Sequence, residues 1–136
     1  MSDMLKALQV AALGMKAQGT RMRIISQNLA NADTAANTPG EMPYQRQIVT
    51  FKNVLDRTKD LSHVEVNKIA TDPKPFKLKF DPSHPGANTD GYVKMPNVDP
   101  LIEIMDMREA QRSYEANLGI IEVTKSMAMR TIDLLR

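Results

Sequence analysis

The hydrophobic pattern divides the chain into two helical ends and a proline-rich middle. Between Met4 and Asn31 no proline occurs, and apolar or small residues recur alternately three and four positions apart, which is the spacing of a heptad seam. The seam positions are Leu5, Leu8, Ala12, Met15, Gly19, Met22, Ser26 and Leu29. The pattern predicts one long helix, with Ser2 or Asp3 as its N-cap. Because several seam residues are small, the helix buries little area per turn and requires a partner.

The last part of the chain predicts a second, longer helix. Pro100 suits a first helical turn, where its missing amide donor is not needed, and Asp99 is a candidate N-cap. A second seam then runs through Ile104, Met107, Gln111, Tyr114, Leu118, Ile121, Lys125, Ala128, Ile132 and Leu135. At about 1.5 Å per residue this helix is roughly 50 Å long. A chain of 136 residues does not need such a length for its own core, so we expect part of this helix to meet something outside the subunit.

The middle of the chain reads as short strands. All eight prolines lie between positions 39 and 100, which excludes long helices there. Runs with β-branched, aromatic or alternating apolar residues occur at 48–51, 64–66, 76–80 and 92–95, and the last follows an Asp90-Gly91 turn signal. We expect a small antiparallel sheet with loops at 35–42 and 81–88.

The predicted fold is therefore α+β and mainly α. Residues 1–34 and 100–136 form the two terminal helices, which pair as the halves of a coiled coil, and residues 35–99 form a β-rich middle domain. Two arrangements stay open at this point. The helices form a hairpin that only covers the sheet, or the helix pair also packs on copies of itself or on related proteins.

Composition narrows the function. Three tyrosines, three phenylalanines and no tryptophan indicate a thin molecule, or one that completes its core against neighbours. The net charge is +2 and the basic residues form no cationic run, so nucleic acid is not an expected partner. No apolar stretch reaches the ~20 residues that span a bilayer. The apolar run at 7–15 is interpreted as part of the mature helix, not as a cleaved leader, because the helical pattern continues past it.

Nothing in the sequence favours catalysis. The chain has no cysteine, no glycine-rich phosphate loop and no nucleophile elbow. His63 and His84 lie in predicted strand or loop, and a turn role between Pro82 and Pro85 is the favoured interpretation of His84. We therefore expect no enzyme activity, no cofactor and no metal.

Three motifs point to a family. Ser26–Thr34, followed by Tyr44–Gln47 and Phe51, resembles the N-terminal signature of flagellar axial proteins. Near the other end, Met105–Met107, Ala110–Asn117 and Lys125–Met127 resemble the C-terminal signature of that family. Between them, the stretches at 81–85 and 90–98 are similar to those of one branch, the C-type proximal rod proteins of the bacterial flagellar basal body. The segment Ala35–Pro43 departs from the family pattern as an insert.

This resemblance implies a structural subunit that assembles with other rod proteins and with copies of itself. It implies export by the flagellar type III apparatus without a cleaved signal peptide, and a place in the periplasmic rod of the basal body. In such proteins the paired terminal helices line the hollow drive shaft and export channel, and they become ordered on assembly. Flagellum assembly and motility depend on such subunits. The resemblance does not suggest an integral membrane protein.

Seam and motif residues together define the predicted assembly interface. Asn28 holds the elbow between helix and sheet or bonds a neighbour, and Asn31 either does the same or ends the helix in a left-handed conformation. Asn117 flanks the second seam, where an amide sets helix register. The predicted interface residues are Leu8, Met15, Met22, Asn28, Leu29, Asn31, Tyr44, Met107, Tyr114, Asn117, Leu118, Ile121 and Ile132.

Two alternatives accompany this hypothesis. One is another rod protein of the same family, of the B-type or the distal kind. The other is a small ligand-binding or hydrolytic module, which predicts a compact, fully ordered monomer with a pocket near His84 and Asp81.

Overall fold

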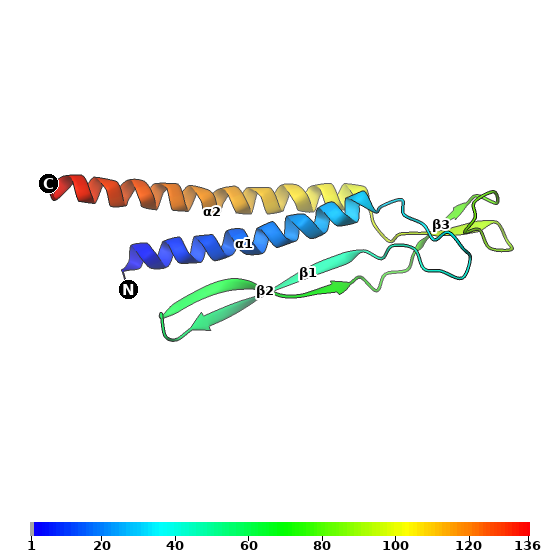
Figure 1. The fold of residues 1–136 in the computed structure, drawn as a ribbon, viewed down its shortest axis with the longest axis horizontal. Coiled ribbons are helices and arrows are strands. Elements are labelled where there is room, and N and C mark those ends of the chain that lie inside the picture. Colours follow the sequence, from blue (N-terminus) through cyan, green and yellow to red (C-terminus); the bar gives the residue numbers. More distant parts are fainter. Residues whose placement is uncertain (1) are drawn as a thin grey trace. The chain divides into compact units, whose positions relative to one another are not determined.

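The computed structural model describes residues 2–136, and Figure 1 shows the course of the chain. Helices form both ends and two short ribbons form the middle, so the fold is α+β and mainly α, as the sequence predicted. The elements are α1 (Asp3–Ala30), β1 (Gln47–Asp56), β2 (Leu61–Thr71), β3 (Lys77–Phe80), β4 (Tyr92–Met95) and α2 (Pro100–Leu134).

Local capping explains where the helices begin. The Ser2 hydroxyl accepts the Leu5 N–H at 3.3 Å, and the Asp99 carboxylate accepts the Leu101 N–H at 3.1 Å. Each bond satisfies one of the free amides of a first helical turn. Pro100 is the first residue of α2, where it removes no intrahelical bond. The predicted cap at Asp99 is confirmed, and Ser2 is the cap of α1.

The end of α1 corrects one of the two interpretations of Asn31. Within residues 2–136 the one non-glycine residue with a positive φ is Asp60, so Asn31 does not end the helix in a left-handed conformation. Its side-chain amide instead donates to the Gln27 carbonyl at 2.9 Å. That bond occupies one of the last carbonyls, which have no partner inside the helix.

The middle forms two separate two-stranded ribbons where one small sheet was expected. β1 pairs with β2, and β3 pairs antiparallel with β4, with Lys77 opposite Met95 and Phe80 opposite Tyr92. Pro73 and Pro75 lie between β2 and β3 and have no amide hydrogen, which prevents the ladder from continuing.

The turns of the two ribbons use residues that tolerate unusual backbone angles. Asp60 closes the β1–β2 turn with a φ of 50°, and the Asp56 side chain accepts the Thr58 N–H at 3.0 Å. Gly91 has a φ of 83° directly before β4, which confirms the predicted turn. The Phe80 and Tyr92 rings meet edge to face at 5.3 Å.

The chain separates into two compact units, and each takes a part of both helices. The first contains the residues up to Met22, Thr50–Lys68 and Arg108–Arg136. The second contains Arg23–Val49 and Ile69–Met107. The division into three parts at 1–34, 35–99 and 100–136 stays a prediction.

In the first unit the helices pack antiparallel through small residues. Ala11 and Ala110 are buried, and Asn117 of α2 lies directly over Gly14 of α1. Arg21 pairs with Glu109 at 3.4 Å. Small side chains at these positions allow the backbones to approach closely.

This packing face precedes the predicted seam by one residue in both helices. Ala11 and Ala110 belong to the packing face, whereas the neighbouring seam positions Ala12 and Gln111 are exposed. The seam prediction is therefore out of register for the packing at these positions, because heptad spacing alone does not decide between two adjacent stripes of a helix.

Two glycines of α1 provide a direct test of this close approach. A Cβ added at Gly19 meets nothing within 4 Å, so Gly19→Ala should raise the free energy of unfolding by about 0.5–1 kcal/mol through helix propensity alone. A Cβ at Gly14 would lie 2.9 Å from the Asn117 amide nitrogen, so Gly14→Ala should show no such gain. Urea unfolding followed by circular dichroism measures both. An equal gain at both positions would contradict the close packing at Gly14.

Candidate functional site: an assembly interface

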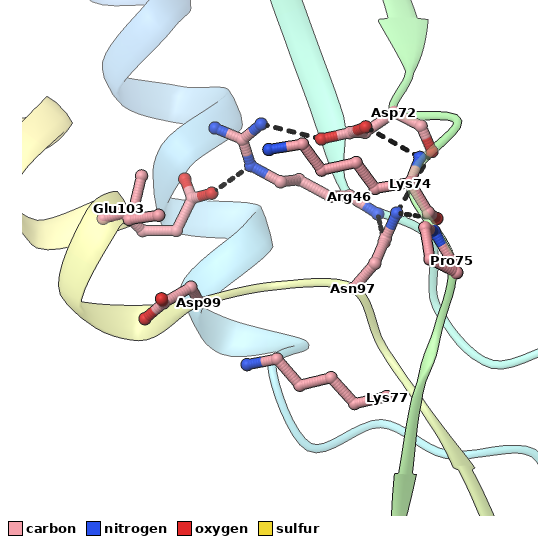
Figure 2. A pocket seen from close by; sticks show the side chains of 9 residues that line it. Arg46, Asp72, Lys74, Pro75, Lys77, Asn97, Asp99 and Glu103 are labelled. Carbon is pink, nitrogen blue, oxygen red and sulfur yellow. Dashed lines mark hydrogen bonds and ion pairs between the residues drawn. The ribbon is translucent and has the colours of Figure 1, made fainter.

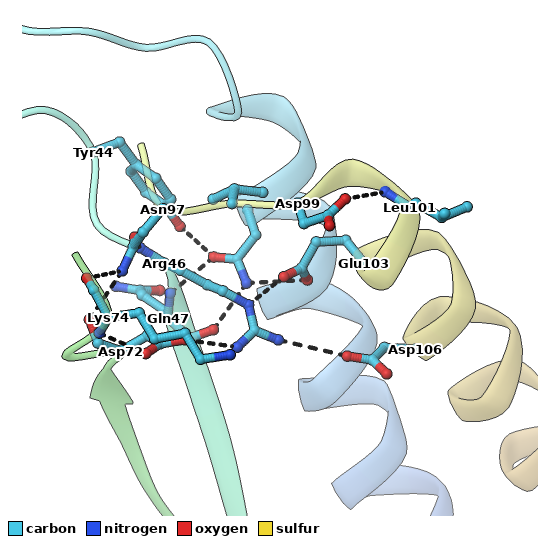
Figure 3. A network of polar contacts seen from close by, with 12 residues as sticks. Tyr44, Arg46, Gln47, Asp72, Lys74, Asn97, Asp99, Leu101, Glu103 and Asp106 are labelled. Atoms are coloured by element: carbon cyan, nitrogen blue, oxygen red, sulfur yellow. Dashed lines mark hydrogen bonds and ion pairs between the residues drawn. The ribbon is translucent and has the colours of Figure 1, made fainter. Parts of the chain in front are cut away.

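A buried asparagine joins the end of α1 to the start of β1 in the second unit. The Asn28 side chain is 1% exposed, and its Oδ1 accepts the Tyr44 hydroxyl at 2.7 Å and the Gln47 N–H at 3.0 Å. Its Nδ2 donates to the Gln47 carbonyl at 2.8 Å and to a Glu103 carboxylate oxygen at 3.3 Å (Figure 3). The Asn28 side chain thus forms both backbone hydrogen bonds of Gln47, which a neighbouring strand would otherwise provide. Asn28 holds the elbow, which is one of the two roles predicted for it.

Arg46 forms the charged centre of the same unit. Its guanidinium donates to Glu103, to Asp72 at 3.0 Å, and lies 3.5 Å from Asp106 (Figure 3). Glu103 is completely buried and Asp72 nearly so. Desolvation by itself lowers the pKa of Arg46, but the hydrogen bonds to Glu103 and Asp72 outweigh it and raise that pKa. The ion pairs therefore stabilise the charged form of Arg46, which burial alone would disfavour.

Asn97 ties this centre to the segment between the ribbons. Its Oδ1 accepts the Arg46 N–H at 2.7 Å, and its Nδ2 donates to the carbonyls of Asp72 and Lys74. Figure 2 shows these groups turned toward one another around a pocket of about 300 Å³. We call the set Asn28, Tyr44, Arg46, Asp72, Asn97 and Glu103 the elbow cluster. Because its polar groups bond one another, the elbow cluster holds the segments that it joins in place.

The Asp72 carboxylate gives the elbow cluster a pH dependence. The Lys74 N–H bond first, and then the bond from Arg46, hold the pKa of Asp72 below its ordinary value of 3.8. A group with a depressed folded-state pKa stabilises the fold above its unfolded pKa, and this contribution is lost as the pH falls through the folded value. Asp72→Asn should therefore cost about 2 kcal/mol at pH 7, a cost that shrinks as the pH falls below about 4. Urea unfolding at pH 7 and pH 3 measures this, with exposed Asp90→Asn as the control. An equal cost at both pH values would contradict it.

The loop around His84 is held by its own turn contacts. The Gly86 N–H donates to the His84 Nδ1 at 2.9 Å, and the Ser83 hydroxyl donates to Asp81 at 2.8 Å. The small cavity of about 30 Å³ beside it is lined by Gly86 and by residues of the neighbouring loop and β4. Among residues 2–136 no three histidine or acidic side chains are grouped so that they would hold a metal ion.

The predicted interface residues fall into three groups by exposure. Asn28 is buried in the elbow cluster, and Leu118 and Ile132 are exposed. The remaining ones are half-buried: Leu8, Met15, Met22, Leu29, Asn31, Tyr44, Met107, Tyr114, Asn117 and Ile121. Tyr44 and Asn117 use their polar groups within the chain, since Asn117 donates to the Ser113 carbonyl at 3.0 Å.

Most of the exposed apolar surface of α2 lies outside the predicted set. These side chains are Leu101, Ile102, Ile104, Met105, Ile120, Val123, Met127, Met129 and Leu134, in addition to Leu118 and Ile132. We call them the outer apolar residues of α2. An exposed apolar surface of this extent is typical of an interaction surface. The sequence signal was present, but a single heptad seam selects only one stripe of the helix.

Arg46, Asp72, Asn97 and Glu103 were not among the predicted site residues. Arg46 and Asn97 do fall inside the quoted family motifs, but no spacing rule links them with Asp72 or Glu103. The sequence did contain one indication for Glu103, because it is the acidic residue in the first turn of α2.

Both ends of the chain match models of flagellar rod proteins. Residues 8–35 match the family described as "Flagella basal body rod protein", and residues 89–134 match "Flagellar basal body rod FlgEFG protein C-terminal". The two matches cover the helical ends that the fold brings together in each unit. They define a rod protein of the flagellar basal body.

Full-length relatives specify the branch. The chain is 46% identical to the flagellar basal-body rod protein FlgC of Agrobacterium fabrum, over 100% of this chain and 98% of the relative. It is 40% identical to FlgC of Bacillus subtilis, over 94% of this chain and 95% of the relative, and 34% identical to FlgC of Salmonella typhimurium, over 96% and 97%. The chain belongs to the FlgC family of flagellar basal-body rod proteins and is a structural subunit of the rod. This confirms the resemblance found in the sequence motifs.

Neither helix is apolar enough over a sufficient length to cross a bilayer, within the residues that the structure describes.

Proposed function

We propose that the outer apolar residues of α2, with the predicted interface residues of both helices, form the contacts through which this subunit polymerises. The buried side chains of α2 are Glu103, Ala110 and Thr124, whereas most of its larger apolar side chains are exposed. The proposal rests on this distribution of buried and exposed side chains. Burying these side chains against a neighbour removes apolar area from water, which is the main driving force for protein association.

The elbow cluster supports the same function from inside the subunit. A rod subunit transmits torque, so the angle at which its chain leaves α1 has to stay constant under load. Four hydrogen bonds on Asn28 and the ion pairs of Arg46 hold that elbow. In this proposal the mechanism is packing and rigidity, and the subunit performs no catalysis.

The place and route of assembly follow from the family. We propose that the subunit is passed through the flagellar type III export apparatus and joins other rod proteins and copies of itself in the periplasm. There the helix pairs line part of the hollow shaft and export channel. The resemblance of the terminal motifs to those of axial proteins supports this.

Ile132→Glu tests the assembly interface. The side chain is 55% exposed, so the substitution should leave the subunit folded while placing a charge in the proposed contact. In a strain that carries it as its sole copy, we expect cells without complete rods and hooks that do not swim. Electron microscopy of basal bodies and swimming in soft agar measure the two effects.

Leu78→Glu is the matched control. Leu78 is 63% exposed and lies on β3, outside the two helices in sequence, so cells with this variant should swim. Normal rods and swimming with Ile132→Glu, at an unchanged subunit level, would overturn the proposed interface. Complete rods in a strain that lacks the gene would overturn the rod role itself.

A further inference from the structure

The first unit contains a pocket that the elbow cluster does not use. Its volume is about 260 Å³, and α1, the β1–β2 ribbon and α2 all contribute to its wall. Gln18 of α1, His63 of β2 and Asn117 of α2 line it together with smaller residues such as Gly14 and Ser113. Since each element contributes a polar side chain, the pocket is a feature of the folded unit and not of one helix.

His63 presents an unpaired acceptor atom in this pocket. The ring is 8% exposed, and its Nε2 lies 2.8 Å from a Glu65 carboxylate oxygen. Because a carboxylate only accepts, Nε2 carries the hydrogen and Nδ1 keeps its lone pair. Nδ1 is buried and has no hydrogen-bond partner among residues 2–136. The bond from His63 also lowers the pKa of Glu65.

Two further acceptors face the same space. The Gln18 Oε1 is buried and lacks a partner among the described residues. The Asn117 Nδ2 donates to the Ser113 carbonyl, and the Asn117 Oδ1 receives no hydrogen bond from the part of the chain that the structure describes. Buried polar atoms without partners are rare in native structures, because each forfeits its hydrogen bonds to water. Two of the three acceptors, the His63 Nδ1 and the Gln18 Oε1, are buried in this way, and solvent reaches the Asn117 Oδ1. Together they call for a ligand rich in donors.

We propose that this pocket takes the guanidinium group of an arginine from a neighbouring copy of the chain. A guanidinium has five N–H donors in a rigid plane and no acceptor, so one group can serve all three oxygen and nitrogen acceptors. The chain supplies such groups: Arg108, Arg112 and Arg130 of α2 are exposed and have no ion-pair partner among residues 2–136. The choice of a second copy as the source rests on the assembly proposed above.

A solution experiment tests the chemistry without assembly. The purified chain, labelled for NMR, is titrated with ethylguanidinium chloride, and with tetramethylammonium chloride at the same ionic strength. We expect saturable shifts of the His63 ring and the Gln18 and Asn117 amide signals with ethylguanidinium only, because tetramethylammonium cannot donate. Gln18→Met, which keeps the volume and removes one acceptor, should weaken binding about tenfold. Equal shifts with both salts, or none with either, would overturn the proposal.

An experiment in assembled basal bodies tests the source of the arginine. A photo-crosslinking residue replaces Asn53 at the rim of the pocket, and crosslinked peptides are identified by mass spectrometry. We expect an arginine-containing peptide of this same chain, with the yield reduced about tenfold by Gln18→Met. A crosslink to a different rod protein, or none in complete basal bodies, would overturn the assignment to a second copy. A failure of the assembly proposal itself would be detected with the Ile132→Glu strain. The result of the titration does not depend on assembly.

Discussion

Glu103→Gln should lower the free energy of unfolding by about 3 kcal/mol. Glu103 is completely buried and accepts from both Arg46 and Asn28. Glutamine keeps the volume but removes the charge, so the Arg46 guanidinium loses its most deeply buried counterion. Breaking a buried pair in this way costs about 3–5 kcal/mol, and the remaining bonds of Arg46 to Asp72 and Asp106 place the effect at the lower end.

Glu109→Gln is the matched control for this prediction. It lies two turns further along the same helix and also pairs with an arginine, Arg21, but its side chain is 69% exposed. Solvent-exposed pairs contribute about 0–1 kcal/mol, so its loss should be hard to measure. Urea unfolding of both variants at pH 7 gives the comparison. Similar costs at the two positions would show that burial of the elbow cluster does not determine its strength.

Asn28→Ala should cost about 2–4 kcal/mol and should also disturb the elbow. The substitution leaves the Gln47 N–H and carbonyl and the Tyr44 hydroxyl without their partner, beside a side chain that is itself 1% exposed. Each buried group left unsatisfied costs about 1–3 kcal/mol. Amide hydrogen exchange at Gln47 should accelerate along with the loss of stability.

Gln27→Ala provides the comparison for Asn28→Ala. Gln27 precedes Asn28 on the same helix and is exposed, and only its backbone carbonyl is used, by Asn31. Its substitution should leave both stability and Gln47 exchange unchanged. If Asn28→Ala unfolds with the same midpoint as Gln27→Ala, the elbow is held by other contacts.

Features with a local cause could be predicted from the sequence. The caps at Ser2 and Asp99 depend on residues two or three positions away, and the turn at Gly91 depends on the conformational freedom of one residue. The strands followed from alternation within four or five residues. The separation into two ribbons could also have been foreseen, because Pro73 and Pro75 stand between β2 and β3.

Features that join distant segments could not be predicted in the same way. Arg46 meets Asp72 after β2 and both Glu103 and Asp106 on α2, and charged residues far apart in sequence have no spacing rule. The helix face was placed one residue late for a related reason. Heptad spacing fits two adjacent stripes of a helix, and this chain buries Ala11 and Ala110, which lie one residue before the predicted seam. Only the assembled fold shows which of the two stripes faces inward.

The pairing of the two chain ends also governs when this subunit can fold. Arg21 and Glu109 are 88 positions apart, so the helix pair closes one of the longest loops that the chain allows. Loop closure must precede the contacts that reward it, and chains rich in such distant contacts fold slowly. A chain emerging from the ribosome with its N-terminus first has no helical partner for α1 until residues 108–134 have followed. The first unit therefore cannot form until these residues have been made, and until then the chain stays open to any machinery that requires an unfolded polypeptide.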